Sequence, residues 1–190
     1  MLYNLAQNDI NERLQDFSRI FYKSANITIG ENFFLREENC DLITMPLFLY
    51  LVDDIVLFMK KIHHMLDTGG LFIANFIGGT SLIDLKFAFT QAQIDLDYPH
   101  YPMIIPMIQQ SDILCLVKEA GFDINISDRT EITIKYTSIE KMIKHLMCVE
   151  KIKVFLNTDK LTDEFLQKVQ ILYNKDFISL ELITITCVAG

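Results

Sequence analysis

Histidine and cysteine are the residue types in this chain that most often carry chemistry, and their spacing favours neither a metal site nor a catalytic triad. They are His63, His64, His100 and His145, and Cys40, Cys115, Cys148 and Cys187. The adjacent pair His63–His64 would face different directions on a helix, and no two cysteines have the CxxC spacing of a metal or redox motif. We therefore expect no metal site. We expect the histidines on helix surfaces, and the cysteines as free, mostly buried thiols in a reducing compartment. Cys115 lies in an apolar helical run and is expected in the core.

The composition is that of one folded, acidic domain. The chain has 190 residues, 51% of them hydrophobic, and 25 Asp+Glu against 17 Lys+Arg give a formal net charge of −8. Binding to a phosphate backbone requires a basic face, which this balance argues against. The longest apolar stretch, residues 42–52, is shorter than the ~20 residues of a membrane span, and the polar N-terminus does not resemble a signal peptide. We therefore expect a single domain over residues 1–190, cytoplasmic, without a membrane span and without nucleic acid as a partner.

Alternating helices and strands must position any site. The pattern predicts helices at 9–21, 54–67, from 81, at 112–120, 138–148 and from 162, and strands at 25–29, 41–45, 71–76, 122–126, 131–136 and 179–188. Gly69 and Gly70 should end the second helix, and residues 98–106 should form a proline-rich loop. This order indicates an α/β fold whose mostly parallel sheet is covered on both faces. Ligands of such sheets lie beyond the carboxyl ends of the strands.

Two sets of motifs resemble the class I S-adenosylmethionine-dependent methyltransferases. The first, Cys40–Met45, Leu51–Asp54 and Ile62–Ile73, is similar to the family's strand four, the segment after it, and the glycine-containing turn into strand five. The second comprises Gly78–Lys86, Pro106–Asp112, Ala120–Phe122, Asp128–Ile132 and Tyr136. It resembles the branch that contains the malonyl-carrier-protein methyltransferase of biotin synthesis and the complex I assembly factor that hydroxylates arginine. The resemblance covers residues 40–150 and implies a Rossmann-like methyltransferase sheet.

The cofactor-binding half of that family is incomplete in this sequence. The family has a glycine-rich loop after strand one, where the backbone approaches the cofactor closely, whereas Gly30 is the sole glycine here before Gly69. Residues 26–30 align with the family's strand one, or residues 26–35 with its strand three. Either alignment leaves part of the strand 1–3 region missing, so the resemblance implies a truncated cofactor half.

The resemblance also supplies candidate site residues. On the cofactor side they are Gly30, Glu31, Met45, Pro46 and Leu47, and on the substrate side Tyr50, Gly78 and Gly79. Glu31 would bind the ribose of S-adenosylmethionine, and Met45–Leu47 would contact its adenine or methionine. Each candidate has a structural alternative. Gly30 would be a plain turn glycine, Gly78 and Gly79 would form a tight strand-to-helix turn with positive φ, Glu31 would be an exposed carboxylate, and Met45–Leu47 would belong to the core. The family's histidine and tryptophan before strand five are replaced by Tyr50 and Leu51, and its arginine by Lys86. No catalytic residue is assigned.

Two functions follow from the resemblance. The missing glycine loop points to a noncatalytic relative that binds or assembles with a protein, such as a respiratory-complex subunit. The family-like substrate half points instead to an active methyltransferase, or an arginine hydroxylase, that uses S-adenosylmethionine. Missing flanking strands would expose a sheet edge, and exposed edges pair with other chains. We therefore expect a homodimer, or a protein partner, at that edge.

Overall fold

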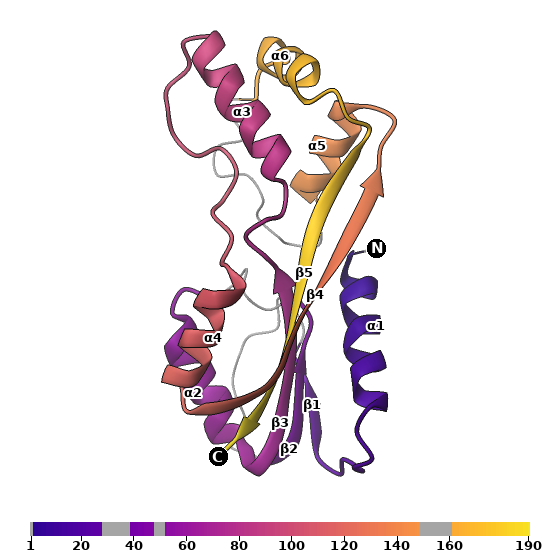
Figure 1. Ribbon diagram of the computed structural model, residues 1–190, viewed down its shortest axis with the longest axis vertical. Helices are drawn as coiled ribbons and strands as arrows, with labels where there is room; N and C mark the ends of the chain where they lie inside the picture. Colours follow the sequence, from indigo (N-terminus) through magenta and orange to yellow (C-terminus); the bar gives the residue numbers. More distant parts are fainter. Residues whose placement is uncertain (1, 28–38, 48–51, 149–160) are drawn as a thin grey trace. The chain divides into compact units, whose positions relative to one another are not determined.

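The computed structural model describes residues 2–27, 39–47, 52–148 and 161–190 (Figure 1). The elements are α1 (Leu2–Gln15), β1 (Ser24–Asn26), β2 (Cys40–Met45), α2 (Ile55–Met65), β3 (Leu66–Ile77), α3 (Ile83–Asp95), α4 (Gln110–Glu119), β4 (Phe122–Lys135), α5 (Ile139–Cys148), α6 (Asp163–Tyr173) and β5 (Phe177–Ala189). This is the predicted order, except that the two strands expected between residues 122 and 136 are one continuous strand, β4. None of the described helices is long and apolar enough to cross a membrane.

The five strands form one sheet in the order β1-β2-β3-β5-β4. β1 and β2 are parallel, as are β2 and β3, whereas β3 and β5 are antiparallel, with Leu71 opposite Val188 and Ile77 opposite Leu182. The expected α/β, Rossmann-like sheet is therefore confirmed. β1 lies directly beside β2, which is the place of strand one next to strand four in the doubly wound order 3-2-1-4-5-6. This neighbourhood fits the alignment of β1 with strand one better than with strand three.

The chain divides into two compact units. The first unit consists of Met1–Gly78, Ile108–Thr130 and Leu182–Gly190, and the second unit of Gly79–Met107 and Glu131–Glu181. Both β4 and β5 contribute residues to each unit. Each unit is described separately below.

In the first unit, helices cover β2 and β3 on both faces (Figure 1). Ile10 of α1 packs with Leu42, Leu71 and Ile73 on one face. On the other face, α2 and α4 pack with the alternate strand residues, which include Ile43, Phe72 and Phe76. Because successive side chains of a strand point to opposite faces, a strand covered on both faces is apolar throughout. This explains the run at residues 71–76, which is apolar apart from Asn75.

α1 differs from the prediction in its bounds. It begins at Leu2 and ends at Gln15, rather than beginning with a cap at residue 8 or 9 and reaching residue 21. Phe17 and Phe21 therefore follow the helix, yet they still pack against the cluster that contains Ile10. The apolar spacing had suggested a longer helix. At Phe17 and Phe21 it instead reflects packing against the core, without a helical backbone.

The prediction that Gly69 and Gly70 end the second helix is wrong. α2 starts as expected, with Asp54 as its cap accepting from the Leu57 N–H at 2.9 Å, but it ends at Met65. The two glycines lie inside β3, where the register shifts: Cys40 is opposite Leu66, while Leu42 is opposite Leu71. Gly69 takes the left-handed region at φ 76°. The glycines therefore serve a bulge in a strand.

Cys115 is exposed, contrary to the expectation that it lies in the core. In α4 the inward positions are taken by Ile113 and Val117, with Ala120 just after the helix, at the spacing of one helical face. Cys40 and Cys187 are buried, as expected, and neither forms a disulfide.

Asp41 anchors the chain where it enters the sheet, at the start of β2. Its carboxylate accepts from the N–H of Tyr22 at 2.5 Å and of Lys23 at 3.0 Å. Burial by itself would raise the pKa of Asp41, but these two N–H groups and the charge of Arg19 outweigh it, so the pKa is lowered. Asp41 therefore helps to hold the segment before β1 against β2.

In the second unit, α3 packs against α6. The rings of Phe89 and Phe165 meet edge to face with centroids 5.5 Å apart, and Tyr98 contacts the same Phe165 ring at 5.2 Å. The Tyr98 hydroxyl and Thr162 Oγ1 are 2.7 Å apart. Thr162 also caps α6, as predicted, by accepting from the Phe165 N–H. An aromatic cluster therefore fixes this helix pair and the beginning of the segment that follows α3.

Candidate functional site

The carboxyl end of β2 lies where the fold would place a ligand, and the residues at this end are buried. Met45 is the last residue of β2, Pro46 follows it, and Leu47 takes the left-handed region at φ 55°. Met45 and Leu47 expose 3% and 0% of their surface, and Pro46 is buried as well. A left-handed conformation costs a residue other than glycine about 1 kcal/mol or more, so this turn requires compensation from its surroundings.

Asn75 of β3 supplies that compensation. Its side chain is fully buried, its Oδ1 accepts from the Leu47 N–H at 3.0 Å, and its Nδ2 donates to the Ala6 carbonyl at 2.8 Å. One amide thus joins the end of β2, the C-terminal part of β3 and α1. A buried polar group is stable only when it is hydrogen-bonded, and both ends of this amide have partners within the protein.

The predicted site residues are distributed unevenly. Gly30, Glu31 and Tyr50 lie outside the described residues. Met45, Pro46 and Leu47 lie together with Asn75 in the first unit. Gly78 ends that unit, and Gly79 belongs to the second unit.

The expectation of positive φ in the turn at Gly78–Gly79 is wrong. Among the described residues the glycines with positive φ are Gly69 and Gly121, and the left-handed residue before α3 is Leu82, at φ 58°. Leu82 is 3% exposed, and its N–H donates to the Ser179 carbonyl. Burial and this hydrogen bond offset a conformation that glycine would adopt more easily.

S-adenosylmethionine is the cofactor that the fold implies, and the described residues at this strand end do not fit it. A nucleotide-like cofactor needs an open surface and free donors or acceptors at the strand ends. Here the exposed area of Met45 and Leu47 is nearly zero, while the Leu47 N–H and the Asn75 amide already bond to each other. No step of a reaction is therefore assigned through the cofactor.

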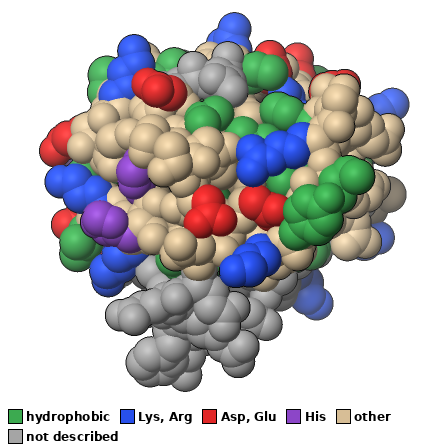
Figure 2. Space-filling view, turned by 90° about the horizontal axis from the view of Figure 1, so that it is seen from below, with side chains coloured by type: hydrophobic (Ala, Val, Ile, Leu, Met, Phe, Trp, Pro, Cys, Tyr) green, Lys and Arg blue, Asp and Glu red, His purple; other side chains and the backbone are tan. Residues whose placement is uncertain are grey.

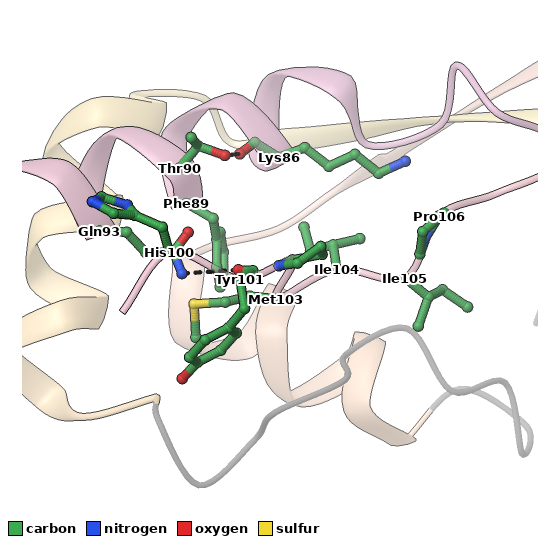
Figure 3. Close-up of a pocket in the computed structure, with 11 residues that line it drawn as sticks. Lys86, Phe89, Thr90, Gln93, His100, Tyr101, Met103, Ile104, Ile105 and Pro106 are labelled. Atoms are coloured by element: carbon green, nitrogen blue, oxygen red, sulfur yellow. Dashed lines mark hydrogen bonds between the residues drawn. The ribbon is translucent and has the colours of Figure 1, made fainter. Parts of the chain in front are cut away.

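A separate cavity of about 410 Å³ lies in the second unit, between α3 and the segment at residues 100–106 (Figure 3). Its lining is Lys86, Phe89, Thr90, Gln93, His100, Tyr101, Pro102, Met103, Ile104, Ile105 and Pro106. Gln93, which is 4% exposed, donates through Nε2 to the carbonyls of Pro99 and Tyr101 at 2.9 and 3.0 Å. These two bonds hold the segment against α3 and so form the wall of the cavity.

Lys86 is the ionisable group of this cavity whose pKa is changed by burial. Burial lowers the pKa of Lys86, and none of the ion pairs in the described part of the chain includes it. The Tyr101 hydroxyl is buried without a hydrogen-bond partner. The sequence showed Lys86 only as a replacement for a family arginine. A signal for the cavity was nevertheless present, since Lys86, Phe89 and Gln93 follow one helical face just before a proline-rich segment.

Elsewhere among the described residues we examined possible metal ligands, the ring of His63 and the surface charge. No group of three His, Cys, Asp or Glu side chains there could hold a metal ion. His63 packs edge to face on Phe122 with ring centroids 4.9 Å apart, so its ring belongs to the packing of α2. On the face that Figure 2 shows, acidic and basic side chains are interspersed, and the described residues form no extended basic area there.

The fold is shared with a solved structure of a methyltransferase-class protein. BH2331 of Bacillus halodurans C-125, which carries a provisional methyltransferase name, superposes with a TM-score of 0.62 over 96% of this chain and 99% of its own, at 11% identity. No family model matches the chain. At this low identity the likeness defines the fold, which is the Rossmann-like fold of class I methyltransferases.

Several curated proteins are similar to this chain in sequence. RP459 of Rickettsia prowazekii, also provisionally named a methyltransferase, is 31% identical over 116 residues, 61% of this chain and 51% of its own. The mitochondrial arginine hydroxylase NDUFAF5 of Homo sapiens is 27% identical over 163 residues, 82% of this chain and 47% of its own, and that of Mus musculus is 28% identical over 144 residues, 75% and 42%. The chain therefore spans about half the length of the curated relatives it matches. The chain is thus similar in sequence to proteins named as methyltransferases and arginine hydroxylases, the branch that the motifs resemble.

Proposed function

We propose that this chain is a methyltransferase-like protein with a degenerate cofactor site, which acts by binding or assembling with a protein partner. The observation that carries the proposal is the buried end of β2. Met45 and Leu47 are buried, and the polar groups beside them are bonded within the protein through Asn75. The lack of a glycine-rich loop in the sequence supports the same conclusion.

The proposed partner is a subunit of a respiratory complex. The support is the relationship to the mitochondrial arginine hydroxylases, whose branch the motifs resemble. The second unit also offers an apolar surface: Ile83, Phe87 and Ile94 of α3 are 63%, 72% and 54% exposed. At this spacing the three side chains lie on one face of the helix, and large exposed apolar side chains gathered in one place mark contact surfaces.

We also propose that the protein is located in the cytoplasm, which is a reducing compartment. The support is that Cys40, Cys115 and Cys187 form no disulfide, because disulfides are typical of oxidising compartments.

The alternative is an active enzyme that uses S-adenosylmethionine to methylate, or to hydroxylate arginine. It is favoured by the family-like motifs of residues 78–136 and by the names of the relatives. Catalysis of methyl transfer would require that the methyl group and its acceptor be held in position.

Calorimetric titration of the full chain with S-adenosylmethionine and S-adenosylhomocysteine separates the two functions. We expect no heat of binding up to ~1 mM cofactor, a concentration at which detectable binding needs only about −4 kcal/mol. Adenosine serves as the control for nonspecific nucleoside binding, and circular dichroism verifies that the sample is folded. Micromolar binding of the cofactor, with no binding of adenosine, would contradict the noncatalytic proposal and favour the enzyme.

A further inference from the structure

We infer that the cavity between α3 and residues 100–106 binds a small organic anion, namely a carboxylate attached to an apolar chain or ring, with Lys86 as its charge partner. This inference goes beyond the proposed function, because it concerns a site in the second unit that involves neither the cofactor nor the partner surface. Three observations carry it: the apolar lining, the half-buried lysine that no ion pair among the described residues includes, and the hydrogen bonds that fix the wall.

The lining suits an apolar ligand body. Phe89 of α3 faces Met103 and Ile104, which are 3% and 6% exposed, and Pro102, Ile105 and Pro106 complete the wall. A volume of about 410 Å³ lies within the range of small-molecule sites, roughly 300–1,000 Å³. Such sites are mostly apolar, with a few polar groups that fix the orientation of the ligand.

Lys86 supplies the polar group. Its side chain extends along the cavity toward Ile105 and Pro106 (Figure 3), and burial lowers its pKa. A partly buried charge is costly unless it is paired, so a carboxylate beside Lys86 would relieve that cost. The apolar surroundings would also make the pairing stronger than one in water.

The remaining polar groups shape the cavity and do not compete for the ligand. Gln93 is bonded to two carbonyls of the wall, and the Thr90 hydroxyl donates to the Lys86 carbonyl at 3.0 Å. The Tyr101 hydroxyl points away from Lys86 in Figure 3, so it is not assigned to the ligand. His100 also lines the cavity, but it is exposed, whereas Lys86 is half-buried. We therefore assign the anion to Lys86.

Nuclear magnetic resonance of the ¹⁵N-labelled full chain tests the inference with three probes: octanoate, its uncharged analogue octanamide, and acetate. We expect octanoate to shift the amide signals of residues 86–106, and both octanamide and acetate to bind at least about tenfold more weakly, since each lacks one of the two matched features. Octanoate binding should also weaken as the pH rises through the lowered pKa of Lys86, because the ammonium loses its charge.

Variants make the test specific. K86M removes the charge while keeping an unbranched chain, and should weaken octanoate binding at least about tenfold. K86R should retain most of the affinity, and K118M, on the exposed surface of α4 in the first unit, should leave it unchanged. Equal binding of octanoate by the wild type and K86M, equal binding of octanoate and octanamide, acetate binding as tight as octanoate, or no octanoate binding would each overturn the inference. A loss in K86M that K86R does not restore would overturn it as well.

Discussion

At the scale of single residues, the amide of Asn75 binds polar groups of α1 and at the carboxyl end of β2. The sequence marks it as the polar residue in an otherwise apolar run at 71–76, and the structure gives it a partner on each side, Leu47 and Ala6. The same bonds that stabilise the left-handed Leu47 also occupy the groups that a cofactor would need. In the proposed degenerate site, these bonds would account both for the stability of the turn and for a loss of cofactor binding.

Replacing Asn75 by alanine should lower the free energy of unfolding by about 1–3 kcal/mol. The buried Leu47 N–H would lose its acceptor, which costs about that amount, and the Ala6 carbonyl would lose its second donor. Urea unfolding followed by circular dichroism measures the change. Asn11→Ala is the matched control, because Asn11 is exposed on α1 and its Oδ1 accepts from Gln7 of the same helix. It should change stability by less than about 0.5 kcal/mol. Equal effects of the two substitutions would contradict this role of Asn75.

Residue-scale inference from the sequence succeeded where a local rule decides the outcome. Asp54 and Thr162 cap their helices as expected, because an N-cap depends on neighbours a few residues away. Leu47, Leu82 and Asn75 depend instead on residues 28 or more positions distant. No short-range pattern contains that information, so the bonds at the end of β2 could not be predicted. The cavity at Lys86 differs, because the helical spacing of Lys86, Phe89 and Gln93 was visible in the sequence.

At the scale of elements, the bulge in β3 is the clearest departure from the sequence pattern. A glycine pair after a helical run usually ends a helix, but here the helix ends earlier and the strand absorbs both glycines. The tertiary pairing of β3 with β2 decides this, since Leu66 already lies opposite Cys40. Similarly, residues 122–126 and 131–136 read as two strands because their alternation lapses between them, yet one continuous strand, β4, spans Phe122–Lys135.

The two bulge glycines should differ in their tolerance of alanine. A Cβ at Gly70 would lie 2.8 Å from the Asp67 carbonyl oxygen and 3.1 Å from that of Cys40, whereas at Gly69 nothing lies within 4 Å. Gly70→Ala should therefore cost more than about 2 kcal/mol, because the backbone must shift. Gly69→Ala should cost about 1 kcal/mol, from its positive φ alone. Thermal unfolding of both variants measures the difference, and an equal or reversed order would show that the backbone at Gly70 moves freely.

At the scale of the whole molecule, the order of elements was predicted well because hydrophobic periodicity reports burial along most of the chain. The described sheet has β1 at one edge. Since the Lys23 carbonyl and the Ile27 N–H bond to β2, strand alternation directs the N–H groups of Ser24 and Asn26 outward. This is the edge at which we propose pairing with a second copy or a partner.

Light scattering coupled to size exclusion should give a mass of twice 22.1 kDa for the full chain. Ser24→Pro should reduce it to the monomer, because proline removes an outward N–H without touching the bonds to β2. Phe87→Glu, on the exposed face of α3, is the comparison variant and should leave the dimer intact. A monomeric wild type would contradict the proposed homodimer, and a monomer with Phe87→Glu alone would assign the contact to α3.

The division of the chain into interleaved segments has a consequence for synthesis on the ribosome. β3 emerges long before its antiparallel neighbour, because Leu71 pairs with Val188, 117 residues later (188 − 71). At about 5–20 residues per second, that interval is roughly 6–23 s. Throughout it the nascent chain would present one side of an apolar strand, a natural target for chaperones, and the first unit would close only when the last segment, Leu182–Gly190, had left the exit tunnel.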